Sequence, residues 1–227
     1  MNDGTELARC QRYYLNGQKI ERILKLEQTP TQTAQLYDAE TQRPFRDGQR
    51  VLSVTDVLKI NGLYDGFPVD EYFLWMGQAR HKAIELLVRG ELDIDKLHVD
   101  LIPSVNAYIV FEKATGFKPY RGAKGSEVEF WNEQLKLATR LDLLGQFPDK
   151  TEAIVELKSG SIGKPTALQT AGQDITMGGP RRKRYGLSVP KTGAPSVRAF
   201  TSSDDYSKFV SCLNVAHLRI EHFGVKL

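Results

Sequence analysis

The stretch TRLDLLGQFPDKTEAIVELK, residues 139–158, decides the fold because it reads as two β-strands joined by a turn. Apolar residues recur through 140–147 and again through 153–157, which is typical of strands in a buried sheet. Between them, Pro148-Asp149-Lys150-Thr151 supplies residues that favour turns. The stretch therefore predicts a hairpin in which residue 147 lies opposite residue 152.

Three charged residues come together in this predicted hairpin. Its pairing sets residue 142 opposite residue 157, so that Asp142 lies beside Glu156 and Lys158. Two carboxylates this close repel each other unless a cation lies between them, and oxygen ligands suit Mg²⁺ or Mn²⁺. A nearby lysine can orient a water or stabilise charge on a phosphate oxygen. The pattern predicts metal-assisted phosphodiester hydrolysis, and the alternative is a strand pair with solvated charges.

Asp142, Glu156 and Lys158 resemble the core of the PD-(D/E)XK nuclease superfamily, and the phrases RLDLLGQF and AIVELKSG are most similar to its RecB-like exonuclease branch. The resemblance implies an α/β fold with a mixed central β-sheet flanked by helices. Pro148-Asp149 also spells the family's name, but it lies in the turn, about 20 Å along the strand from Glu156. We therefore expect Asp142, and not Asp149, to bind the metal.

A second motif lies in VLSVTDVL, residues 51–58, where Ser53 is placed to cap a short helix over residues 55–58. A helix start is the simplest interpretation. Ser53, Thr55 and Leu58 also resemble an S-x-T-x-x-L phrase near the beginning of RecB-like nuclease domains. This resemblance implies that Ser53 and Thr55 help to hold a DNA phosphate.

The third motif lies on a predicted helix over residues 70–89, which Gly90 ends. Gly77, His81 and Glu85 recur every four residues and therefore share one side of this helix. They resemble the G-x-x-x-H-x-x-x-E helix of the same branch. The resemblance implies that His81 is a metal ligand and that Glu85 supports it, although a lone histidine is more often structural.

A predicted strand over residues 127–137 precedes the hairpin, after a helix over residues 103–115. The resemblance implies a glutamate one strand before the aspartate; Glu127 is our preferred match and Glu129 the alternative. It also implies the following metal ligands: His81, Asp142, Glu156 and the carbonyl of Leu157.

After the hairpin, Pro165 opens a helix that Gly178-Gly179-Pro180 ends. Gln169 and Gln173 lie four residues apart and face the same way. Gln169 matches the glutamine of a Q-x-x-x-Y motif in the branch, which implies that it positions substrate. Gln173 stands where the tyrosine is expected, so the chain departs from the motif there.

A basic run opens a predicted strand that continues through Val189; a second strand over residues 195–200 and a final helix from about residue 204 to 220 follow. Such a run is either a solvated edge or a phosphate-binding surface with an aromatic for base stacking. The residues concerned are Arg181, Arg182, Lys183, Arg184 and Tyr185.

The composition is that of a globular protein with 227 residues and a net charge of only +3. We expect one nuclease domain over residues 51–227 and an extension over residues 1–50 packed on it. No apolar run is long enough for a membrane, so no membrane partner is expected. Two isolated cysteines suggest an intracellular, cytoplasmic protein and exclude an iron–sulfur cluster held by four cysteines of this chain.

These observations predict a Mg²⁺- or Mn²⁺-dependent DNA exonuclease acting in recombination, repair or genome processing, with a phage origin left open. A structure-specific endonuclease of the same fold and a non-catalytic nucleic-acid-binding module are the alternatives. The expected partner is single- or double-stranded DNA with free ends. The sequence contains no GxxxxGK[ST] motif, so unwinding would need a helicase, and annealing a separate protein.

Overall fold

The computed structural model describes residues 14–15, 18–19, 36–38, 41–64, 71–191 and 195–227. Six further short strands accompany the longer ones: β1 (Tyr14–Leu15), β2 (Gln18–Lys19), β3 (Phe45–Arg46), β4 (Gln49–Arg50), β5 (Leu52–Ser53) and β6 (Lys118–Pro119). The longer strands are β7 (Ser126–Asn132), β8 (Leu137–Gln146), β9 (Glu152–Lys158), β10 (Lys183–Ser188) and β11 (Ser196–Ala199). The α-helices are α2 (Val54–Ile60), α3 (Glu71–Arg89), α4 (Ile102–Thr115), α5 (Pro165–Met177) and α6 (Asp204–Phe223). Three 3₁₀ turns span Ile94–Lys96, Val99–Leu101 and Gly122–Lys124.

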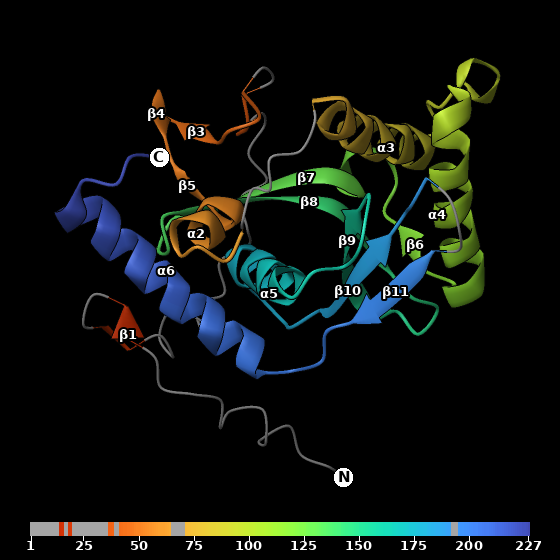
Figure 1. Ribbon diagram of the computed structural model, residues 1–227. Helices are drawn as coiled ribbons and strands as arrows, with labels where there is room; N and C mark the ends of the chain where they lie inside the picture. Colours follow the sequence, from red (N-terminus) through yellow and green to blue (C-terminus); the bar gives the residue numbers. More distant parts are fainter. Residues whose placement is uncertain (1–13, 16–17, 20–35, 39–40, 65–70, 192–194) are drawn as a thin grey trace, which may run out of the picture.

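A mixed seven-stranded sheet forms the centre of the fold (Figure 1). Its main path runs β11-β10-β9-β8-β5, and β6 and β7 also pair with β8. The β8–β9 and β7–β8 pairs are antiparallel, whereas β10 lies parallel to β9 after the α5 crossover. The predicted class, a mixed central sheet flanked by helices, is confirmed.

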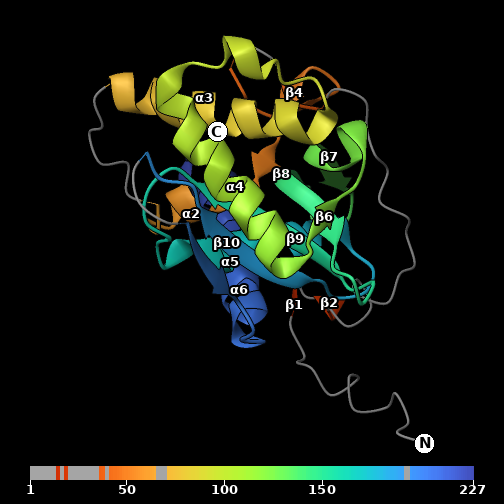
Figure 2. The same cartoon turned by 90° about the vertical axis from the view of Figure 1, so that its right-hand side faces the viewer.

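Helices cover both faces of the sheet, as the two views show (Figures 1 and 2). Neighbouring residues of β9 show the two sides: Val155 packs in a core with α3 and α4, whereas Ile154 packs in a cluster with Met177 of α5. A third core joins α2, α5 and α6 around Phe209. Because β9 is buried on both faces, its charged residues depend on partners supplied by the helices.

One edge of β8 is only partly covered by other strands. β7 and β6 pair along one side of β8, while on the other side β9 pairs with residues 143–146 and β5 with residues 137–138. Among the described strands, none pairs with residues 139–142 on that second side. Asp142 lies at the end of this gap, where β8 and β9 stop pairing.

The hairpin register differs from the prediction by one residue. Gln146, not residue 147, lies opposite Glu152, and the last backbone pair toward the site joins Leu143 to Val155. The turn is one residue shorter than predicted, residues 148–150 in place of 148–151, because the Phe147 N–H donates to the Thr151 carbonyl across it, at 3.0 Å. Continuing this register sets residue 142 opposite 156 rather than 157, which brings the two carboxylates to the same side.

The predicted strand over residues 127–137 is two strands with a turn between them. β7 ends at Asn132, whose side chain accepts a hydrogen bond from the Leu135 N–H at 3.0 Å, and β8 begins at Leu137. Lys136 has φ of +48°, which reverses the chain. The predicted helices are confirmed: α3, α4 and α5 begin or end within a residue or two of their expected positions.

Within the predicted N-terminal extension, Leu36 and Tyr37 lie against the sheet. The Glu129 carboxylate accepts hydrogen bonds from the N–H groups of Leu36 and Tyr37, at 2.6 and 3.1 Å. Leu36 packs in a small core with Trp131 and Ala138. None of the described helices is long and apolar enough to cross a membrane.

Candidate active site

Three side chains from three elements form a compact group that could hold a metal ion. His81 of α3, Glu127 of β7 and Asp142 of β8 each offer one ligand atom, and these atoms lie within 4.8 Å of one another. His81 Nδ1 lies 3.4 Å from Asp142 Oδ1. All three side chains are partly buried. One nitrogen and two carboxylate groups at this spacing match the ligands that divalent cations take in proteins.

Local backbone features bring these three residues together. A Cβ at Gly77 would stand 3.3 Å from the Ser159 hydroxyl, so the glycine lets α3 lie close to the loop after β9, one turn before His81. On β7, Glu127 has φ of +51°, a left-handed conformation that is uncommon for glutamate. This twist turns Glu127 toward Asp142, whereas Glu129 binds the backbone of the extension. The structure therefore places Glu127, and not Glu129, in the group.

The acid–base properties of the group reflect its crowding. Burial and the charge of Asp142 raise the pKa of Glu127 to about 7. Burial alone would lower the pKa of His81. The charge of Asp142 and its hydrogen bond to the imidazole outweigh burial and raise this pKa above the usual value. Burial would raise the pKa of Asp142, but His81, Lys158 and the Leu157 N–H together lower it. In the metal-free protein, protons therefore offset charge where a cation would otherwise do so.

Glu156 lies beside this group and is held by side-chain donors. Its Oε1 accepts hydrogen bonds from Lys158 Nζ at 2.9 Å and from Gln169 Nε2 at 2.7 Å. Its Oε2 accepts one from Gln173 Nε2 at 2.8 Å. The carboxylate is 4% exposed, and burial together with the charge of Asp142 raises its pKa. Glu156 is not one of the three residues in the compact group, although it was a predicted ligand.

Lys158 is surrounded by groups that favour its charged form. Besides Glu156, its Nζ donates to Gln169 Oε1 at 3.0 Å and to the Tyr64 hydroxyl at 3.2 Å. Burial would lower the pKa of Lys158, but the charges of Glu156, Tyr64 and Asp142 raise it. Lys158 is therefore an ammonium donor at neutral pH. Gln169 bridges it to Glu156, which supports the positioning role predicted for Gln169.

Asp142 also closes the end of the hairpin ladder. Its Oδ2 accepts a hydrogen bond from the Leu157 N–H at 2.7 Å. This bond fixes the carboxylate between the two strands at the point where their backbone pairing ends. The Leu157 N–H is thereby accounted for, and the predicted role of the Leu157 carbonyl as a ligand stays a prediction.

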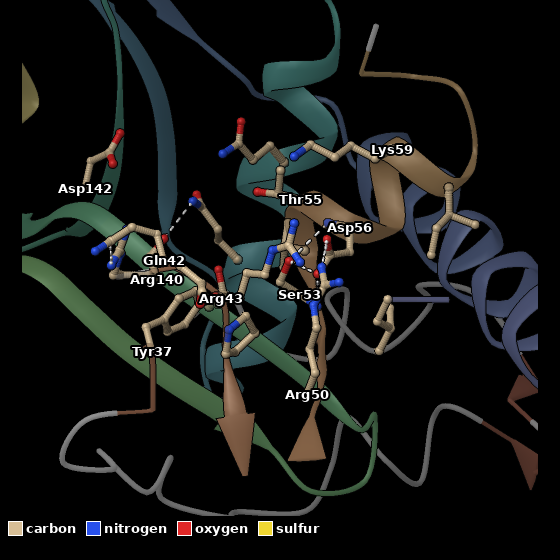
Figure 3. A pocket seen from close by; sticks show the side chains of 18 of the residues that line it. Tyr37, Gln42, Arg43, Arg50, Ser53, Thr55, Asp56, Lys59, Arg140 and Asp142 are labelled. Carbon is tan, nitrogen blue, oxygen red and sulfur yellow. Dashed lines mark hydrogen bonds and ion pairs between the residues drawn. The ribbon is translucent and has the colours of Figure 1, made fainter. Parts of the chain in front are cut away.

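A cavity of about 840 Å³ opens beside these residues (Figure 3). Asp142 lies at one side of it and Asp56 and Lys59 at the other, with Arg140 and Arg43 between. Its lining includes Thr139, Arg140 and Asp142, from the uncovered stretch of β8 described above, together with Glu156, Gln169 and Gln173. The gap in the sheet is therefore where solvent reaches the site.

Cations are numerous around this cavity. Arg50 pairs with Asp56 at 3.0 Å, and Arg140 pairs with Glu127 at 2.8 Å. Within the part of the chain that the structure describes, three other lining cations are exposed and form no ion pair: Arg43, Lys59 and Lys226. Their charges are available to an anionic ligand.

Two predicted supporting residues have other tasks in the structure. Ser53 caps α2 in a capping box, because its hydroxyl accepts from the Asp56 N–H and donates to the Asp56 carboxylate. That carboxylate occupies the start of α2, where a phosphate was expected to bind. Glu85 pairs with Lys82 and Arg89 on its own helix, at 2.9 and 2.8 Å, and lies outside the metal group. Thr55 lines the cavity, as its predicted role requires.

The basic run is largely an internal network rather than a row of exposed cations. Arg184 is 3% exposed and donates to Asp205 and to the carbonyls of Ala167 and Ser202. Arg182 bonds Glu152 and Asp174. For these two arginines the expected DNA contact is replaced by a structural role.

The other members of the run lie nearer the surface. Lys183 pairs with Asp149 of the hairpin turn at 3.0 Å, and both side chains are about half exposed. Arg181 stacks on Tyr206 at 4.0 Å from the ring centroid. Tyr185 packs against Phe147. Sequence alone could not separate the buried cations from the exposed ones, because alternate strand residues carry the same charge.

Comparisons with known proteins show a distant structural likeness and no match by sequence. No family model matches the chain, and the search of curated proteins found no match. Among solved structures, the crystal structure of a candidate exonuclease from Eubacterium rectale is 11% identical, with a TM-score of 0.49. The match covers 78% of this chain and 83% of that chain. A likeness at this level decides neither the family nor the activity.

Proposed function

We propose that this protein is a metal-dependent deoxyribonuclease of the PD-(D/E)XK type that hydrolyses DNA from free ends. The observation that carries the proposal is the meeting of His81, Glu127 and Asp142 beside the Glu156–Lys158 pair, at the uncovered edge of β8. Such an arrangement places oxygen-rich metal ligands and the ammonium group of Lys158 at the same opening. Membership of the RecB-like branch belongs to the proposal and rests on the sequence motifs.

The group fits a hard divalent cation. Burial and the neighbouring charge of Asp142 together raise the pKa of Glu127, which is the electrostatic situation that a cation relieves. The ligands would be His81, Glu127 and Asp142, with Glu156 alongside; Mg²⁺ or Mn²⁺ is the proposed ion. When bound, such an ion polarises a phosphodiester and lowers the pKa of a water.

The chain's own residues then have distinct tasks. Lys158, held as an ammonium by Glu156, would exchange its bond to the Tyr64 hydroxyl for one to a phosphate oxygen or to the attacking water, and so stabilise the charge that develops. Its raised pKa argues against Lys158 as the base that deprotonates water at neutral pH. Gln169 keeps the lysine and Glu156 in register through both ends of its amide.

The cavity supports a polyanionic substrate. Arg43, Lys59 and Lys226 surround it without acidic partners among the described residues, and Asp142 and Glu156 lie within the same lining. A nucleic-acid backbone would place its phosphates against the cations and the scissile bond at the carboxylates. A helicase or a strand-annealing protein would be a proposed partner of this activity.

The test is a digestion assay on end-labelled linear single- and double-stranded DNA and on closed circular DNA, with EDTA, Mg²⁺ or Mn²⁺. We expect metal-dependent loss of linear DNA alone. Asp142→Asn should lower the rate by more than about 100-fold because it removes a ligand. Lys158→Met should lower it by about 10²–10³-fold.

Asp149→Asn is the matched control, because Asp149 is an exposed turn residue in the same hairpin that contacts Thr151 and Lys183. It should cleave like the wild type. Equal activity in Asp142→Asn and Asp149→Asn would refute the assignment. Cutting of circles would change the proposal to an endonuclease, and binding of DNA without any cleavage would leave a non-catalytic module.

A further inference from the structure

Gln173 lies beside residues 139–142, the stretch of β8 that no described strand covers on the side of the candidate site. It lies on α5, one turn after Gln169, and is 1% exposed. Its Nε2 donates to Glu156 Oε2 on β9 at 2.8 Å and lies 3.4 Å from the carbonyl of Arg140 on β8. The same amide therefore contacts both strands beyond Leu143 and Val155, the last backbone pair between them.

We propose that Gln173 is a positioning residue that sets the spacing between Asp142 and Glu156; this inference rests on the proposed function. Where two strands pair, their ladder fixes the distance between opposed side chains. Between residues 139–142 of β8 and the end of β9 no ladder exists in the described structure. The bond from the Leu157 N–H holds Asp142 to β9, and the amide of Gln173 supplies the corresponding link from Glu156 to the backbone of β8.

The hydrogen bonds of Glu156 show why one glutamine would not suffice. Lys158 and Gln169 both bond Oε1, so they leave the carboxylate free to turn about that oxygen. Among the described residues, Gln173 is the donor to Oε2. Removing it would release one end of the carboxylate and allow Glu156 to rotate relative to Asp142. The similar motif would place a tyrosine here. A tyrosine hydroxyl has one donor hydrogen, whereas the glutamine amide has two, which it can share between two strands.

The remaining atom of the amide adds a second observation. Gln173 Oε1 is buried and has no hydrogen-bond partner among the residues that the structure describes. An unmatched buried acceptor costs stability, because it loses its hydrogen bonds to water on folding. The side chain is therefore poorly matched as a purely structural residue, since leucine would fill the space without that cost. Retention of the amide fits a residue whose donor end is needed at the site.

The experiment compares Gln173→Leu with Thr170→Val, a matched control on the same helix. Thr170 is also fully buried, but its hydroxyl bonds only backbone carbonyls of α5. Binding of Mn²⁺ is measured directly by calorimetry, the Mn²⁺ dependence of cleavage is measured in parallel, and thermal denaturation monitors folding. We expect the Mn²⁺ concentration for half-saturation to rise at least about tenfold in Gln173→Leu and to stay unchanged in Thr170→Val.

A second variant separates the donor from the volume. Gln173→Met keeps the length and most of the volume but has no N–H donor, and it should weaken Mn²⁺ binding as Gln173→Leu does. Wild-type Mn²⁺ affinity in either folded variant would overturn the proposal, as would an equal loss in Thr170→Val. The binding measurement does not need cleavage: a wild type that binds Mn²⁺ but cuts no DNA refutes the proposed function, while the comparison of variants still decides the role of Gln173.

Discussion

Binding of a divalent metal should release protons from the candidate site, and Glu127 should be the main pH-dependent contributor near neutrality. With a pKa of about 7, Glu127 is half protonated at pH 7. A metal ligand must be deprotonated, so this residue alone should release about 0.5 proton per metal at pH 7, about 0.9 at pH 6 and about 0.1 at pH 8. His81, whose pKa is also raised, adds a further fraction.

The direction of the pH dependence follows from the same competition. A carboxyl group with a raised pKa holds its proton against the metal, so the apparent affinity should increase as the pH rises through 7. From the Glu127 equilibrium alone, the apparent affinity should increase by about tenfold between pH 6 and pH 8, or about 1.4 kcal/mol. In the metal-free protein the protonated Glu127 carboxyl stabilises the fold fully below its ordinary pKa of 4.5, and this stabilisation is lost as the pH rises from there through about 7.

Calorimetric titration with Mn²⁺ in two buffers of different ionisation enthalpy measures the number of protons released. Glu127→Gln should reduce that number by about 0.5 at pH 7. Glu129→Gln, two residues along β7 and bonded to the backbone of Leu36 and Tyr37, should leave it unchanged. Equal proton release by the wild type and Glu127→Gln, with an affinity independent of pH between 6 and 8, would refute this account of the group.

Two further predictions concern the scaffold. Gly172→Ala should destabilise the fold by about 1–3 kcal/mol or more, because the new methyl would stand 2.4 Å from the buried Phe209 ring; thermal denaturation beside Gly160→Ala, which has nothing within 4 Å, checks this. Arg184→Met should cost about 3–5 kcal/mol by breaking a buried pair, whereas Lys183→Met should change stability by less than about 1 kcal/mol. Similar urea midpoints for these last two variants would contradict the structural role given to Arg184.

Helices and their ends could be predicted from the sequence because the signals are local. Gly116 ends α4 in the left-handed conformation, and Pro165 opens α5. The S-x-T phrase likewise predicted a capped helix, and Ser53 caps α2. Each of these depends on one residue and its immediate backbone, so no knowledge of distant contacts was needed.

The strand register and part of the site could not be predicted, because they depend on details without a sequence signal. The hairpin turn closes over residues 148–150, one residue fewer than predicted, through a non-glycine left-handed conformation at Lys150, and this shifts the pairing by one. The turn of Glu127 toward Asp142 needs the same kind of conformation. Gln173 was visible in the sequence only as a departure from a motif, and its contacts with Arg140 and Glu156 required the fold.

The metal group draws its members from very different parts of the chain, and this affects how the protein folds. Glu127 and Asp142 lie on adjacent strands that can pair early because the loop between them is short. We expect His81 to join the two carboxylates later, when α3 packs on the folded sheet. A bound ion would then act as a cross-link between helix and sheet, slowing their separation. Chelation should accordingly speed the release of α3, so that limited proteolysis begins in this helix while the sheet is still intact.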